Sequence, residues 1–439
     1  MQTWRKRLEA YFEFARLGAN WRTELLAGAT TFITMAYIVF VNPSILREAG
    51  VPFEAAMIAT CISAAFGCIL MGAYARYPIA MAPGMGLNAY FAFVVVKGMG
   101  LPWQTALGAV FLSGVLFLVL TLLRVRQWIV AAIPHELYAA VSAGIGLFIA
   151  FIGLRNAGII VASPATLVAM GDLTSAGPAL AVFGLLLIAV LRAWNVRASM
   201  LIGIISTTVL AAVTGVAEWR PGSYDIGAIG QTAFELDVMA ALARGVLEVI
   251  LVFFFVDLFD NVGTLVAVSQ KAGLVDENYQ IPRIDRILLS DSIATIAGSM
   301  AGTSTVVSYI ESAAGVAAGG RTGVTAIVTG LLFVVSLFIA PLLGAVPAAA
   351  TAPALIVVGS LMISAVREID WEDAVVAVPA FLTLLTIPLT FSIANGLAFG
   401  FTAYVLLAAI RRGPRAVSWP MYAMTALFVF RFIYMAREH

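Results

Sequence analysis

Long apolar stretches separated by short polar connections run along almost the whole chain. A membrane-crossing helix needs about 20 mostly apolar residues, and most of the stretches approach or reach that length. They form two sets of seven, at residues 25–42, 54–74, 79–97, 103–123, 138–154, 177–191 and 199–216, and at 244–268, 287–301, 303–318, 323–343, 352–366, 373–391 and 393–410. The pattern predicts an all-α polytopic membrane protein with fourteen transmembrane segments.

Two amphipathic stretches flank these segments. Residues 1–24 are too long and too polar for a cleavable signal, so we expect a retained cytoplasmic helix there. The stretch 419–436 carries Arg431 near its middle, which is typical of an interfacial helix rather than of a further span.

The composition agrees with a bilayer as the main partner of the chain. Hydrophobic residues make up 62% and charged residues 11% of the sequence, and the mean hydropathy is +1.00. A soluble domain carries about 25% charged residues, so this chain lacks the charge to cover a water-exposed surface. The net charge of +1 gives no indication of nucleic-acid binding.

Lysine and arginine residues gather on one side of this predicted arrangement. Twenty fall in the two tails and in connections on the N-terminal side, and five fall in the opposite connections, which together account for all 25. Cytoplasmic loops carry such an excess. We therefore expect a multi-pass protein of the cell membrane with both termini in the cytoplasm.

The two sets of seven segments also suggest an internal repeat. An odd number of spans per half makes the halves inverted, an architecture in which substrate lies between discontinuous helices. The string IPHELYAAVSAGIGLF resembles VPAAATAPALIVVGSL, with Pro134 and Pro347 aligned. This similarity alone does not separate a repeat from a chance match of two apolar, alanine-rich segments.

Four polar residues interrupt the predicted spans: Asp257, Asp260, Glu311 and Asn88. An ionised carboxylate at the bilayer centre costs at least about 2.5–3.5 kcal/mol on insertion scales, so these acids need a compensating use. Asp257 and Asp260 are three residues apart and share a helix face, where they could share a proton, a substrate or a file of water. The alternatives are structural: a hydrogen bond that caps or holds a broken helix for the acids, and packing for Asn88.

Glycine, proline and hydroxyl residues surround these polar positions. Pro83, Gly84 and Gly86 precede Asn88, and the string GTST at 302–305 precedes Glu311. Neither run sustains a regular helix, and exposed backbone is tolerated at membrane depth only where it is buried in protein or lines a cavity. Both runs fall in the third segment of their set, which indicates a binding site between the two halves.

Other chemistries find no support in the sequence. It has two histidines, one at the C-terminus, and no metal-ligand spacing, nucleotide-binding glycine loop or Ser/His/Asp arrangement. We therefore expect neither an enzyme nor a cofactor. A carrier fits best, and the alternative from another class is a channel whose acids form a selectivity ring. An anion carrier would be expected to use cationic groups or helix dipoles instead.

Five separated strings give the chain a family resemblance. They are TTFITMAYIVFVNP (30–43), APGMGLNAYFAF (82–93), VDLFDNVGTL (256–265), SYIESAAGVAAGGRTG (308–323) and PAFLTLLTIPLTFSIANG (379–396). These strings closely resemble the AzgA-like purine permeases, a branch of the nucleobase/ascorbate transporter superfamily. The resemblance runs from about residue 10 to the last span.

This resemblance implies a fold similar to that of the uracil permease, with fourteen segments in two inverted seven-segment repeats. A core domain would comprise 25–123 and 244–343, and a gate domain 138–216 and 352–411. The third and tenth segments would contain short strands that pair near the site. The implied activity is import of adenine, guanine and hypoxanthine coupled to protons, with a uracil or xanthine carrier on the same fold as the alternative. A homodimer is compatible with the sequence, which does not fix the oligomeric state.

The resemblance also assigns roles to residues. Its substrate-binding positions fall on Asp257, Glu311, Asn88, Gly86 and Ser308, and its proton-coupling positions fall on Asp257, Asp260 and Glu311. We expect Asp257 and Glu311 to accept hydrogen bonds from purine N–H groups, with Asp257 or Asp260 as the proton carrier. One departure is Asn261, where the family commonly has threonine, and we expect it to affect selectivity among purines.

Overall fold

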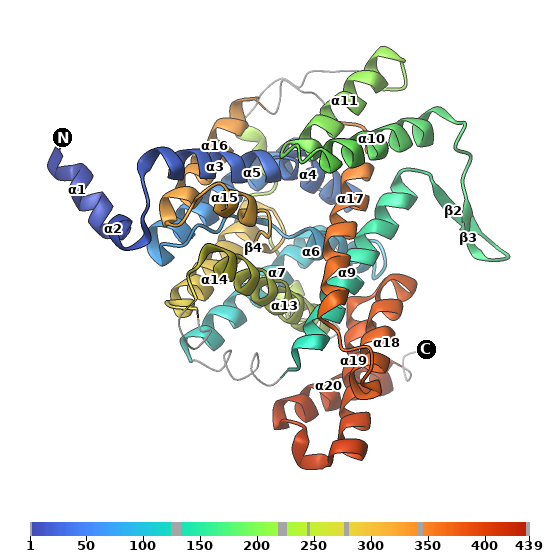
Figure 1. The fold of residues 1–439 in the computed structure, drawn as a ribbon. Coiled ribbons are helices and arrows are strands. Elements are labelled where there is room, and N and C mark those ends of the chain that lie inside the picture. The colour runs from blue at the N-terminus through green and yellow to red at the C-terminus, as the bar shows by residue number, and fades with distance from the viewer. Residues whose placement is uncertain are drawn as a thin grey trace. The chain divides into compact units, whose positions relative to one another are not determined.

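Helices make up most of the chain (Figure 1). By their contacts the helices group into two compact units. The structure, a computed structural model, describes residues 2–123, 133–217, 226–243, 246–275, 281–339 and 346–435. The first unit combines Met1–Val119 with Gly153–Leu355, and the second combines Leu120–Ile152 with Ile356–His439. Each unit is therefore assembled from segments that are far apart in the sequence.

The first half of the chain supplies the following elements: α1 (Gln2–Tyr11), α2 (Phe14–Leu17), α3 (Trp21–Met35), α4 (Ile38–Glu48), α5 (Phe53–Leu70), η1 (Met71–Ala75), β1 (Met81–Pro83), α6 (Met85–Ala89), η2 (Tyr90–Val96), α7 (Trp103–Leu122), α9 (His135–Asn156), β2 (Ile160–Ser163), β3 (Leu167–Met170), α10 (Ala176–Ala193) and α11 (Ser199–Val213). β2 and β3 form a hairpin. β1 pairs outside its own half, as described below.

The second half supplies η3 (Ile226–Gln231), α12 (Val238–Ala241), α13 (Leu247–Ala272), α14 (Ile284–Ala301), β4 (Val306–Ser308), α15 (Ser312–Ala317), α16 (Gly323–Ile339), α17 (Ala348–Met362), η5 (Ile363–Glu368), α18 (Ala374–Thr390), α19 (Ile393–Arg412), η6 (Pro414–Ala416) and α20 (Trp419–Met435). α20 occupies the stretch in which a C-terminal helix was expected. Parts of the predicted stretches, namely 1, 244–245, 340–343 and 436, lie outside the described residues.

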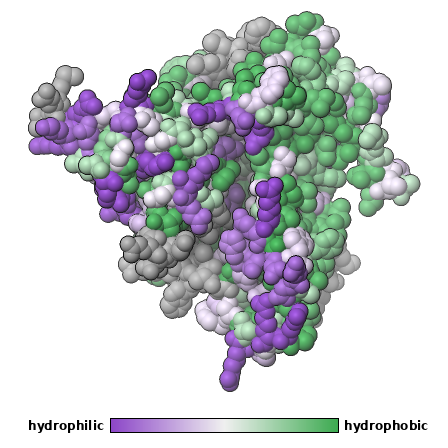
Figure 2. Space-filling model, viewed as in Figure 1, coloured by the Kyte–Doolittle hydropathy of each residue, from purple (hydrophilic) through white to green (hydrophobic). Residues whose placement is uncertain are grey.

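Many of these helices are suited to a bilayer. Seven in the described part are long and apolar enough to cross a membrane: Trp21–Glu48, Phe53–Ala75, Trp103–Leu122, His135–Asn156, Ala176–Ala193, Ala348–Glu368 and Ile393–Arg412. Large apolar side chains such as Leu186 and Phe338 are more than half exposed, and hydrophobic residues cover much of the face shown in Figure 2. These features confirm a helical, multi-pass membrane protein.

The N-terminal segment differs from the single helix expected over residues 1–24. Glu13 has a backbone φ of 58° and Gly18 has a φ of 60°. This left-handed conformation cannot continue a right-handed helix, so α1 and α2 end there. α3 then starts at Trp21, where the side chain of Asn20 accepts a hydrogen bond from the backbone N–H of Thr23.

A cluster of charges ties this segment to the rest of the first unit. Glu13 forms ion pairs with Arg16, with Arg76 after η1 and with Arg283 before α14. Burial by itself would raise the pKa of Glu13, but the hydrogen bond from Arg16 and the positive charges of Arg283 and Arg76 lower it below its ordinary value of 4.5. These contacts bring together three segments that the charge pattern assigns to the same side of the membrane.

A buried glutamate joins α3 to the start of α16. The carboxylate of Glu24 is fully buried and accepts hydrogen bonds from the backbone N–H groups of Arg321 and Thr322 and from the hydroxyl of Thr325, at 2.6–3.2 Å. A carboxylate at a helix N-terminus satisfies backbone donors that have no partner in the helix. The guanidinium of Arg321 in turn donates to the carbonyl oxygen of Val316 at the end of α15. The segment that carries Glu311 is thereby anchored at its far end.

Two glycines allow close packing between η1 and α16. A Cβ atom on Gly72 would lie 2.3 Å from the carbonyl oxygen of Gly323, and a Cβ on Gly323 would lie 2.0 Å from that of Gly72. Small residues at such contacts let helix backbones approach each other within membranes.

We predict that Gly72→Ala destabilises the protein, because the added methyl group forces the two backbones apart, at a cost of about 1–3 kcal/mol. The melting temperature of the detergent-solubilised protein, followed by size-exclusion chromatography after heating, measures the effect. Gly177→Ala is the matched control, since a Cβ on Gly177 in α10 meets no atom within 4 Å. Equal melting of the two variants would contradict the tight contact.

Candidate functional site

Two short strands from opposite halves of the chain form an antiparallel pair. β1 and β4 align Met81 with Ser308, and Pro83 with Val306. The pairing continues beyond the strands, because the N–H of Tyr309 donates to the carbonyl oxygen of Ala80 at 2.9 Å. Both strands are fully buried. The expectation of paired strands in the two broken segments is confirmed.

The sequence at each break explains why a helix stops there. Gly302 ends α14 with a φ of 101°, and a Cβ at this position would lie 2.2 Å from the Cβ of Thr232. Only glycine satisfies both conditions without strain. In the first half, Pro83 has no N–H group and disfavours helix in the residue before it. Each strand is followed directly by a new helix, α6 after β1 and α15 after β4.

Asp257 lies in the middle of α13 and is connected to β4 through Asn261. The side-chain amide of Asn261 donates to Oδ1 of Asp257 at 2.8 Å, and its oxygen accepts from the backbone N–H of Ser308 at 3.0 Å. Asp257 and Asn261 are fully buried. Asn261 therefore holds the carboxylate in a fixed orientation against the strand pair.

Glu311 precedes the first turn of α15 and does not cap that helix through its side chain. Its Oε1 instead accepts a hydrogen bond from the hydroxyl of Tyr37 at 2.8 Å. The Tyr37 side chain is only 1% exposed, whereas Glu311 and Asp260 are partly exposed. The carboxyls of Glu311 and Asp260 are close enough to interact electrostatically. A capping role for Glu311 is thus excluded.

Asn88 lies on α6, two residues after Gly86, in a helix that contacts α13. Its side chain is fully buried, and neither its oxygen nor its nitrogen has a hydrogen-bond partner among the described residues. The same holds for the hydroxyl of Ser308. A buried polar group without a partner costs about 1–3 kcal/mol. These atoms are therefore suited to hydrogen bonding with a ligand.

The structure brings most of the predicted site residues together. Asp257 and Ser308 are linked through Asn261, and Asp260 interacts with Glu311. Asn88 and Gly86 belong to the neighbouring broken segment but form no hydrogen bond to this group in the described part of the chain. No group of three His, Cys, Asp or Glu side chains among the described residues could hold a metal ion.

Two polar contacts were not anticipated from the sequence. Tyr37 is one of three aromatic residues in the segment 25–42, and nothing in the pattern indicates that its hydroxyl meets Glu311. Asn42, fully buried, donates to the hydroxyls of Thr60 and Thr303 at 2.7 and 2.9 Å. An asparagine in the apolar run 30–43 was the available signal for this network, which ties α4 and α5 to the chain before β4.

Comparisons with known proteins identify the family and relatives of this chain. The model of the permease family matches residues 22–399. The adenine permease AdeP of Escherichia coli (strain K12) is 45% identical over 98% of this chain and 96% of its own. The guanine/hypoxanthine permease PbuG of Bacillus subtilis (strain 168) is 45% identical over 98% of this chain and 100% of its own.

A solved structure supports the fold. The transmembrane domain of a cyanobacterium bicarbonate transporter, BicA, superposes with a TM-score of 0.62 at 16% sequence identity, over 91% of this chain and 97% of that domain. This similarity concerns the inverted-repeat fold alone. Taken with the full-length relatives, the family match shows that the chain belongs to the permease family, a family of transporters and not of enzymes.

Proposed function

We propose that this protein is a secondary active transporter that imports the purine nucleobases adenine, guanine and hypoxanthine by proton symport. The names of the similar permeases AdeP and PbuG support this substrate class. The observation that carries the proposal is the buried group of carboxylate and amide side chains beside the paired strands β1 and β4. The proton is the coupling ion, and no other cofactor enters the proposal.

The chemistry of the site suits a purine. Purine edges present N–H groups that donate and ring nitrogens that accept hydrogen bonds. The carboxylates of Asp257 and Glu311 accept from N–H groups, and the buried amide of Asn88 supplies one donor and one acceptor. Ser308 adds a hydroxyl, and Gly86 has no side chain that would obstruct a flat ring beside α6. Such bonds are strong in surroundings of low dielectric constant.

Asn261 has a positioning role in this scheme. Both polar ends of its side chain are occupied, one by Asp257 and one by the N–H of Ser308. It therefore acts on the substrate through Asp257 rather than by direct contact. This sharpens the expectation that Asn261 affects selectivity among purines.

The acidic pair Asp260 and Glu311 suits proton coupling. Two neighbouring carboxyls do not readily ionise together because their negative charges repel, so the pair can hold a proton. Asp257 is fixed by Asn261, which leaves Asp260 as the better carrier of the two aspartates. A membrane potential of 100 mV provides about 2.3 kcal/mol per proton. That energy sustains a gradient of roughly fiftyfold.

We further propose fourteen membrane segments in two inverted repeats. A core domain of residues 25–123 and 244–343 would move against a gate domain of 138–216 and 352–411, with both termini in the cytoplasm. The pairing of β1 with β4 supports an arrangement in which equivalent segments of the two halves meet. A homodimer is compatible with this scheme.

We expect Asp257→Asn and Glu311→Gln each to lower uptake of radiolabelled adenine, guanine or hypoxanthine by about tenfold to a hundredfold, because each loses a charged hydrogen-bond acceptor. Cells without their own purine permeases provide the assay, with competition by uracil and xanthine to test the alternative substrates. Asp172→Asn, at an exposed loop position, is the control for expression. Retained purine uptake in both site variants would rule out the assignment.

Proton symport predicts that a protonophore abolishes accumulation of the purine in proteoliposomes. Asp260→Asn should lose accumulation driven by a pH gradient but keep exchange of labelled for unlabelled purine, since the proton carrier is removed and the binding site is not. Accumulation that is indifferent to the gradient in the unmodified protein would indicate a facilitator instead.

Asn261→Ala is expected to raise the KM for purine about tenfold, because Asp257 loses the hydrogen bond that orients it. Gln270→Ala, at an exposed position of the same helix, is the matched control. Thermal melting with and without purine separates the two effects: a smaller purine-induced shift in Asn261→Ala supports positioning. An unchanged shift would show that Asn261 only stabilises the fold.

A further inference from the structure

Helix α1 has an exposed apolar stripe. The side chains of Trp4, Leu8 and Tyr11 are 72%, 39% and 48% exposed. Their spacing of four and three residues places them on one face of the helix. The helical repeat of about 3.6 residues per turn places Arg5 on one side of this stripe and Arg7 on the other. An apolar stripe flanked by cations is the pattern of a helix that lies in a membrane interface.

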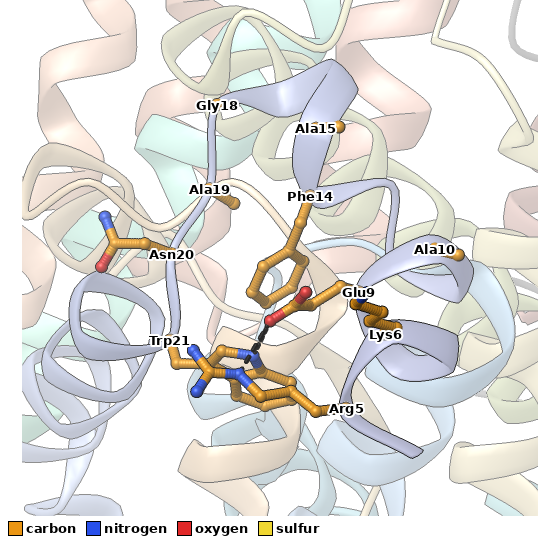
Figure 3. Close-up of a pocket in the computed structure, with 10 residues that line it drawn as sticks. All are labelled: Arg5, Lys6, Glu9, Ala10, Phe14, Ala15, Gly18, Ala19, Asn20 and Trp21. Carbon is orange, nitrogen blue, oxygen red and sulfur yellow. Dashed lines mark hydrogen bonds and ion pairs between the residues drawn. The ribbon is translucent and has the colours of Figure 1, made fainter. Parts of the chain in front are cut away.

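The contacts of α1 fix it close to the membrane. Oε1 of Glu9 accepts hydrogen bonds from the indole N–H of Trp21 at 2.8 Å and from Nε of Arg5 at 2.9 Å (Figure 3). Trp21 is the first residue of a helix long enough to cross the membrane. At the other end of α1, the hydroxyl of Tyr11 donates to the carbonyl oxygen of Ala73 in η1 at 2.7 Å. The helix is thus held at the end of two spans.

A pocket of about 550 Å³ opens between α1 and the start of α3. Its lining combines the cations Arg5 and Lys6 with the rings of Phe14 and Trp21, whose centroids lie 5.0 Å apart (Figure 3). Glu9 is the one acid in this lining and is engaged by Arg5 and Trp21. The lining of the pocket therefore combines cationic side chains with aromatic rings.

The surroundings of α1 are also basic. Arg16, Arg76 and Arg283 gather around the single carboxylate of Glu13, which leaves an excess of positive charge. Anionic lipid headgroups attract each nearby lysine or arginine with a free energy of about 1 kcal/mol. Neither the apolar stripe nor the charge is a strong anchor alone, but the two together bind a membrane surface.

We propose that α1 lies in the headgroup layer of the membrane and binds anionic phospholipids. Trp4 and Leu8 enter the boundary with the acyl chains, and Arg7 contacts phosphates at the edge of the stripe. The pocket takes one headgroup phosphate between Arg5 and Lys6. A helix of ten residues is marginal by itself in water, but its attachment to α3 and η1 keeps it at the bilayer surface.

The test uses the full-length protein in nanodiscs of phosphatidylcholine, with or without phosphatidylglycerol. Leu8→Cys takes an environment-sensitive fluorophore selectively, because the native Cys61 and Cys68 are fully buried. We expect phosphatidylglycerol to shift the emission to the blue and to protect the label severalfold from iodide quenching. High salt should remove this protection, whereas inorganic phosphate in solution should not reproduce it.

Two matched variants complete the experiment. In Leu8→Cys with Arg5→Gln, Lys6→Gln and Arg7→Gln, the ratio of protected to unprotected label should fall about fivefold per cation removed. A label at Leu167→Cys, an 83% exposed residue at the start of β3, should not respond to the lipid. Quenching that is equal in both bilayers, or protection by phosphatidylglycerol that survives removal of the three cations, would overturn the proposal.

Discussion

The need to satisfy backbone hydrogen bonds at membrane depth governs this structure. A helix satisfies its own N–H and C=O groups, whereas a broken helix leaves them exposed in surroundings without water. Here the backbone groups at the two breaks form hydrogen bonds with each other, because β1 and β4 pair over three residues. Because the pairing is antiparallel, α6 and α15 begin at opposite ends of this strand pair, and the polar residues of the candidate site lie on or beside these segments.

The surroundings of this strand pair also determine how the charged residues are tolerated. Asp257 is in contact with Asn261, and Glu311 with Tyr37, so each acid receives a hydrogen bond from a buried neutral donor. None of these contacts neutralises the acids by an opposite charge. The buried Glu24, in contrast, accepts hydrogen bonds from backbone N–H groups and a hydroxyl at the N-terminus of α16. Burial alone thus does not separate Glu24 from the acids of the candidate site, but the identity of the hydrogen-bond donors does.

Much of this arrangement could be predicted from the sequence, because hydropathy and helix breakers are local signals. The central position of Asp257 in α13, and the breaks before Asn88 and Glu311, follow from such patterns. The position of Asn261 between Asp257 and Ser308, in contrast, depends on how two distant segments align. The break at Glu13 was missed because a non-glycine residue with positive φ has no clear mark in composition.

The pairing of β1 with β4 has a consequence for the synthesis of the protein. The two strands are more than 200 residues apart in the chain, and a ribosome adds about 5–20 residues per second. After β1 is made, roughly ten seconds to a minute pass before β4 exists. During that interval the backbone groups of β1 lack their final partners inside the bilayer. Until β4 is synthesised, the backbone groups of β1 must therefore form hydrogen bonds with other partners. Water, the translocation machinery or other parts of the first half can provide them.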